Sequence, residues 1–117
     1  MPVRITSPDP RADAIRGTLA LERGPLVYCV ETADLPAGIE LEEVAIDPTV
    51  APAVVTRDDV APRMVGLRLP AWRRAFGDGP AGATRADSPI EIGAIPYFAW
   101  GNRTPGAMRV WIPRRDR

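Results

Sequence analysis

Cys29 is the only thiol of this 117-residue chain, and the sequence contains no histidine. A thiolate nucleophile needs a base or a metal ion to activate it, and a zinc site needs several Cys, His or carboxylate ligands. Cys29 lies instead within the apolar run Leu26–Glu31, where a thiol usually packs as a small hydrophobic group. We therefore predict that Cys29 belongs to the core, and that the chain carries no catalytic residue, no metal site and no cofactor site.

Paired carboxylates are a second possible source of chemistry, because two such groups can act as acid and base in hydrolytic reactions. None of the glutamates occurs in a recognisable motif. The acidic residues at 40–43 are typical of a solvated edge. Glu31 and Glu91 flank apolar segments, where either could pair with an arginine such as Arg23 or Arg109. We expect these carboxylates to have structural roles.

Aromatic side chains gather near the C-terminal end of the chain. Tyr97, Trp100 and Trp111 could fill the core or an interface with another domain, which predicts buried rings. They could also form a platform for a sugar ring, which predicts exposed rings along a groove. Asn102 suits a left-handed turn, and Arg103 could reach a neighbouring domain. These five residues are our candidate contacts with sugar or with another domain.

The charge balance excludes several classes of partner. Fifteen arginines and fifteen acidic residues give a formal net charge of zero, so nothing favours binding to nucleic acid or to an anionic membrane. No apolar run approaches the roughly 20 residues that a membrane-spanning helix needs. The N-terminal residues are too polar for a secretory signal peptide. Localisation stays open, with the cytoplasm as the default expectation.

Fourteen prolines and ten glycines divide the chain into segments that are too short for long helices. Apolar patterning predicts strands at Ile15–Arg23, Leu26–Glu31, Leu41–Ile46, Ala53–Thr56, Met64–Leu69, Ile90–Trp100 and Ala107–Ile112. About seven or eight short strands predict an all-β, antiparallel sandwich or barrel. We expect one domain over residues 1–113 and a charged tail at 114–117.

Three segments carry more specific predictions. Leu26–Glu31 is apolar on both faces, so we expect both faces of this strand to be covered. Pro25 cannot donate to a strand ladder, which predicts a bulge or an edge position between the first two strands. Pro70–Ser88 is rich in Gly, Pro, Ala and Asp, and is predicted to be a long loop held by Trp72 and Phe76.

Two stretches resemble the C-terminal β-sandwich region of the β-L-arabinofuranosidase family of glycoside hydrolases. The first is Arg23–Cys29, with the sequence RGPLVYC. The second comprises Ala94–Tyr97, Ala99-Trp100, Asn102-Arg103 and Met108–Trp111. The resemblance extends from Met1 to about Ile112, and it implies a β-sandwich of jelly-roll type.

The resemblance also implies a function. In this family a zinc-bound cysteine nucleophile lies on an (α/α) barrel domain, and no segment here resembles that domain. This chain is thus expected to be a non-catalytic accessory domain that packs on the missing barrel, while the complete enzyme cleaves terminal β-L-arabinofuranosyl residues with retention. Met1–Arg4 is similar to an internal segment of the family, so we expect a piece of a longer enzyme. The alternatives are a free-standing carbohydrate-binding module, and a sandwich that covers its apolar patch with a second copy of itself.

Overall fold

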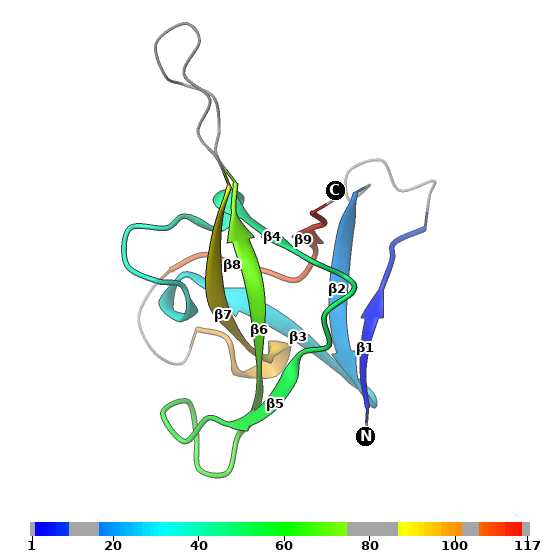
Figure 1. The fold of residues 1–117 in the computed structure, drawn as a ribbon. Helices are drawn as coiled ribbons and strands as arrows, with labels where there is room; N and C mark the ends of the chain where they lie inside the picture. The colour runs from blue at the N-terminus through cyan, green and yellow to red at the C-terminus, as the bar shows by residue number, and fades with distance from the viewer. Residues whose placement is uncertain (1, 10–16, 75–86, 102–105, 116–117) are drawn as a thin grey trace, which may run out of the picture.

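The computed structural model describes residues 2–9, 17–74, 87–101 and 106–115. These residues form nine β-strands and three short 3-10 helices (Figure 1). The strands are β1 (Val3–Thr6), β2 (Thr18–Arg23), β3 (Leu26–Glu31), β4 (Val44–Ile46), β5 (Ala53–Thr56), β6 (Val65–Arg73), β7 (Ser88–Pro96), β8 (Met108–Arg109) and β9 (Ile112–Pro113). The 3-10 helices are η2 (Thr32–Asp34), η3 (Leu41–Glu43) and η4 (Tyr97–Ala99). The all-β prediction is confirmed.

The strands form a curled antiparallel sheet with the order β1-β2-β3-β7-β6-β4. Strand β5 also pairs with β6, β8 with β3, and β9 with β2. Figure 1 shows that β1 and β2 lie across the molecule from β6 and β7, with β3 running between them. The curl encloses the main apolar core, which agrees with a sandwich-type arrangement, while the jelly-roll connectivity remains a prediction.

The main core draws side chains from opposite parts of the curled sheet. Leu21 of β2, Tyr28 of β3, Ile46 of β4, Leu67 of β6 and Ile92 of β7 all belong to it and are almost completely buried. Because each strand supplies alternate residues to this core, the pairing register determines which residues face outward.

Both faces of β3 are covered, as its two apolar faces predict. Tyr28 and Val30 belong to the main core. Cys29 points to the other face and packs with Ile95 and Ala99 in a second, smaller cluster. Cys29 is completely buried, which confirms the prediction that this thiol is a core residue.

The structure corrects the prediction for Gly24 and Pro25. These residues form neither a bulge nor an edge position, because they make the two-residue turn of a hairpin that pairs Arg23 with Leu26. Gly24 has φ +58°, in the left-handed region that glycine adopts at the first central position of such turns. A strand break that looked like an interruption is therefore a reversal of the chain.

Both predicted boundaries of the loop Pro70–Ser88 are also wrong. Strand β6 continues through Pro70 to Arg73, and β7 begins at Ser88. Pro70 is tolerated because it lies between the part of β6 that pairs with β5 and the part that pairs with β4. The proposed anchor Trp72 lies on β6, with the Arg115 guanidinium 3.6 Å from the centre of its ring. Phe76 lies outside the described residues.

Three further boundaries differ from the predictions. Residues Leu41–Glu43 form η3, so only the second half of the predicted strand is extended. The predicted strand Ile90–Trp100 ends at Pro96, where η4 begins. The closing segment is divided into β8 and β9 by a bend at Val110 and Trp111. Within the described parts of the chain, no helix is long and apolar enough to cross a membrane.

Candidate functional site

Three aromatic side chains protrude from the turn that follows β7. Tyr97, Phe98 and Trp100 are 47%, 67% and 41% exposed. Together they form what we call the η4 surface. The alternative in which Tyr97 and Trp100 fill the core of this chain is therefore wrong, while the interface with another domain and the sugar platform stay predictions. The reason is local, because β7 ends at Pro96 and the backbone leaves the sheet before these side chains occur.

The backbone beneath the η4 surface is held firmly. Ala99 is buried beside Cys29 and Ile95, so it fixes the inner side of the turn. The Gly101 N–H donates a hydrogen bond of 3.2 Å to the Glu31 carboxylate, which is itself buried. Gly101 has φ +82°, a conformation that favours glycine. The rings are thus presented by a fixed backbone.

The other candidate contacts do not all join this surface. Trp111 lies in the bend between β8 and β9 and is partly buried. Asn102 and Arg103 lie outside the described residues. Phe98, the most exposed of the large hydrophobic side chains described, was missed by the sequence analysis. The available signal was its position two residues after a proline and directly after Tyr97, because adjacent aromatic residues in a strand cannot both face one core.

A second constellation surrounds Arg57, which follows β5. Its Nη2 donates to Asp34 Oδ1 at 2.8 Å and to Asp59 Oδ2 at 2.7 Å, and its Nε donates to Asp59 Oδ1 at 2.8 Å. These hydrogen bonds, first with Asp59 and then with Asp34, raise the pKa of Arg57 and outweigh its partial burial. The Asp34 side chain is 2% exposed. Arg57 therefore links η2 to the turn after β5.

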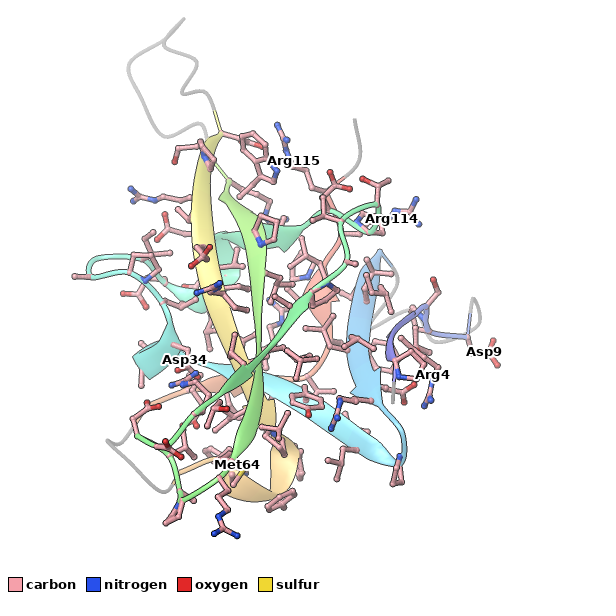
Figure 2. The ribbon with its side chains drawn as sticks, turned by 60° about the horizontal axis from the view of Figure 1, so that its bottom comes forward. Arg4, Asp9, Asp34, Met64, Arg114 and Arg115 are labelled. Atoms are coloured by element: carbon pink, nitrogen blue, oxygen red, sulfur yellow. The ribbon has the colours of Figure 1, made fainter. Side chains whose placement is uncertain are left out.

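The Arg57 side chain lies over two glycines of neighbouring strands. A Cβ atom at Gly66 of β6 would come within 2.5 Å of Arg57 Cγ, and one at Gly93 of β7 within 2.9 Å of Arg57 Nη1. The absence of these two side chains makes the space that Arg57 occupies. Beside it lies a pocket of about 540 Å³, lined by residues from η2, β5, β6 and β7. Figure 2 shows Asp34 next to β7 at this place.

The exposed carboxylates form local structural contacts. Glu22 accepts a hydrogen bond from Thr6 and pairs with Arg4, and both contacts lower its pKa, Thr6 more strongly. Glu91 pairs with Arg68 at 3.6 Å, not with Arg23 or Arg109. These contacts are ion pairs and hydrogen bonds between neighbouring strands, as expected for structural roles.

The described residues hold no group of three or more His, Cys, Asp or Glu side chains that could bind a metal ion. Cys29 is enclosed by apolar side chains, and it offers one thiolate where a zinc–thiolate site needs several ligands. The residues present therefore do not fit the zinc site that the resemblance implies for the family.

Comparison with known proteins matches residues 3–113 to the glycoside hydrolase family 127 C-terminal domain. A non-reducing end β-L-arabinofuranosidase of Bifidobacterium longum subsp. longum is 34% identical over an alignment of 121 positions. The alignment covers 97% of this chain and 18% of the relative. The crystal structure of a family 127 β-L-arabinofuranosidase from Geobacillus stearothermophilus T6 matches with a TM-score of 0.84 and 30% identity, covering 98% of this chain and 18% of that chain.

A further solved structure, described as a glycoside hydrolase, matches with a TM-score of 0.79 and 32% identity, again over 98% of this chain and only 20% of the other. The chain thus spans about a fifth of the length of these relatives. The family match covers almost all of the sequence and confirms the resemblance seen in the two motif stretches. The chain belongs to the glycoside hydrolase family 127 C-terminal domain family.

Proposed function

We propose that this chain is a non-catalytic accessory domain that packs, through its η4 surface, against the catalytic (α/α) barrel of a β-L-arabinofuranosidase-like hydrolase. The observation that carries the proposal is the exposure of Tyr97, Phe98 and Trp100 on a backbone held by Ala99 and the Glu31–Gly101 hydrogen bond. Aromatic side chains of this size contribute strongly to interfaces when they become buried.

The length of the relatives supports a protein partner for this surface. Each relative is about five times as long as this chain, so most of its surface-forming residues lie outside the matched domain. Phe98, the most exposed of the three rings, carries no polar atom. Burial of this ring against another protein surface therefore leaves no hydrogen-bonding group unsatisfied.

The test is binding to the catalytic region of a family 127 relative from which the C-terminal domain has been deleted. We expect the 117-residue chain to bind it, with a blue shift of the tryptophan emission as Trp100, one of three tryptophans in the chain, leaves water. The double variant F98S/W100S should lose binding, measured by sedimentation. Val54→Ser, which removes an equally exposed apolar side chain from β5, should bind like the original chain. Equal binding by the double variant would contradict the proposal.

The absence of activity from the isolated chain is tested separately. We expect no turnover of 4-nitrophenyl β-L-arabinofuranoside, because the described residues contain no group of side chains that could hold the zinc ion of the family. Turnover that persists after purification from a strain lacking the parent enzyme would overturn this expectation.

A second candidate is the free-standing carbohydrate-binding module. The exposure of Tyr97 and Trp100 is what that alternative predicted. It predicts that arabinosides quench Trp100 fluorescence without any protein partner, and that Trp100→Ala abolishes the response. The accessory domain predicts no such response at Trp100.

A further inference from the structure

We propose that the pocket beside Arg57 is a binding site for a neutral saccharide. The site is independent of the proposed docking function, because it uses residues of η2, β5, β6 and β7 and none from the η4 surface. Its volume of about 540 Å³ lies within the range of small-molecule sites, roughly 300–1,000 Å³.

The charges in the pocket argue for a neutral ligand. Four charged side chains line it, two guanidinium groups and two carboxylates, and each is paired within the pocket. Arg57 contacts Asp34 at 2.8 Å, and Arg68 contacts Glu91 at 3.6 Å. Neither an anion nor a metal cation would therefore meet an unpaired opposite charge. A polyhydroxylated molecule can donate to the exposed Glu91 carboxylate and accept from the guanidinium groups at the same time.

The Arg57 guanidinium is already oriented before a ligand arrives. Its Nε and Nη2 atoms are held by Asp59 and Asp34. Its Nη1 lies over Gly93, and within the described part of the chain it has no hydrogen-bond acceptor. The N–H groups of Nη1 can thus bond a ligand hydroxyl without loss of side-chain freedom, which is the main cost that preorganisation removes.

The remaining lining supplies the apolar contact that a sugar ring also needs. Leu35 and Pro36 follow η2, and Val55 lies on β5. Gly93 has no side chain, which leaves room for Arg57 Nη1 at the edge of the pocket. Charged pairs beside aliphatic carbon match the two chemical faces of a pentose or hexose ring, its hydroxyl edge and its C–H face.

The test follows the amide signals of Gly66 and Gly93 in nitrogen-15-labelled chain by NMR. The probes are L-arabinose, D-galactose and methyl β-L-arabinofuranoside at millimolar concentrations, with inorganic phosphate and calcium as charged comparators. We expect at least one neutral sugar, and neither ion, to shift both glycine signals in a saturable way.

Two variants and one control connect the shifts to the pocket. Arg68→Gln keeps an exposed polar side chain on β6 and should weaken binding about tenfold, the effect of one lost charge-assisted hydrogen bond. Gly93→Ala should abolish binding by displacing Arg57 Nη1. Arg4→Gln, which removes an exposed arginine from the ion pair with Glu22, should bind as well as the original chain.

Three results would overturn the proposal: no sugar-dependent shift, a shift caused by phosphate or calcium instead, or sugar binding that Arg68→Gln leaves unchanged. If the Gly66 and Gly93 signals respond only to the catalytic region of a relative, the pocket belongs to a protein interface, and the saccharide proposal is wrong. Failure of the docking experiment at the η4 surface would leave these measurements unaffected, so the two proposals can fail separately.

Discussion

Two glycines leave the space that the Arg57 side chain occupies. Gly66 and Gly93 lie on adjacent strands, on the face of the sheet that points away from the main core. The Arg57 side chain lies over both glycines and forms ion pairs with Asp34 and Asp59. The glycines therefore serve packing, since neither requires a left-handed backbone.

Gly66→Ala is expected to lower the free energy of unfolding by about 1–3 kcal/mol, the usual cost of overpacking. The new Cβ would lie 2.5 Å from Arg57 Cγ and 3.0 Å from the Ala94 carbonyl oxygen, so Arg57 and the sheet cannot both keep their places. Urea unfolding measures the change. Gly106→Ala is the matched control, because its Cβ would meet Thr32 at an ordinary 3.5 Å. Equal stability of the two variants would contradict this account.

The sequence pattern predicted the buried environment of Cys29, but it did not predict the cluster around Arg57. The burial of Cys29 followed from its place in a run that is apolar on both faces. The Arg57 cluster had no comparable signal, because Asp34 is 23 positions away and Gly93 is brought beside it only by the pairing of β6 with β7. Non-local contacts of this kind depend on register, which alternation alone does not determine.

At the level of elements, prolines and glycines were the least predictable features. Gly24 and Pro25 form a hairpin turn, Pro70 lies inside β6, and Pro96 ends β7. The same residue type thus occurs in a turn, within a strand and at a strand end. Proline has no backbone N–H, so its role depends on whether a neighbouring strand would need that hydrogen bond. The pairing of strands in the assembled sheet decides this. The exposure of Phe98 in the η4 surface was missed because the strand was predicted to continue past Pro96.

The short helix η3 is joined to β6 by a carboxylate. Glu43 Oε1 accepts a hydrogen bond of 2.9 Å from the Glu40 backbone N–H, and its Oε2 accepts one of 2.7 Å from Arg73 Nε. These contacts lower the pKa of Glu43 below its ordinary value of 4.5, the Glu40 N–H more strongly than Arg73. The ionised form is therefore favoured in the folded state.

This lowered pKa predicts an acid-dependent loss of stability. The contribution of Glu43 is present above pH 4.5, where the unfolded chain is also ionised, and it is lost as the pH falls through the lower folded-state pKa. Glu43→Gln should thus flatten the decline of the urea midpoint below pH 4.5. Arg73→Gln should flatten it less, because the Glu40 hydrogen bond remains. A Glu43→Gln profile parallel to that of the original chain would refute the prediction.

For the molecule as a whole, one main core ties distant strands together. Its buried residues come from β2, β3, η3, β4, β6, β7 and β9, and strands far apart in the sequence meet there. The sequence predicted this all-β architecture and its family, because short alternating segments and two motif stretches suffice for both. It did not predict that hydrogen-bonded strands continue from β1 to β4 in one sheet, since this order depends on how the sheet curls.

Such a core predicts one cooperative unfolding step, in which fluorescence and far-ultraviolet circular dichroism give the same urea midpoint. Leu67→Ala, at a completely buried position of β6, should lower the free energy of unfolding by about 2–5 kcal/mol. Val54→Ala, at a position of β5 that is 51% exposed, should change it by less than about 0.5 kcal/mol. Separate midpoints for the two probes would show that parts of the sheet unfold independently.

The burial of Cys29 gives this chain a chemical reporter of its own opening. A thiol reagent such as 5,5′-dithiobis(2-nitrobenzoic acid) can reach the sulfur only when β3 separates from the strands and turn that cover it. Because the chain contains a single cysteine, the rate of colour formation counts one event at one known position. At reagent concentrations where labelling outpaces reclosing, labelling kinetics without denaturant therefore give the frequency of opening at Cys29, with no engineered residue.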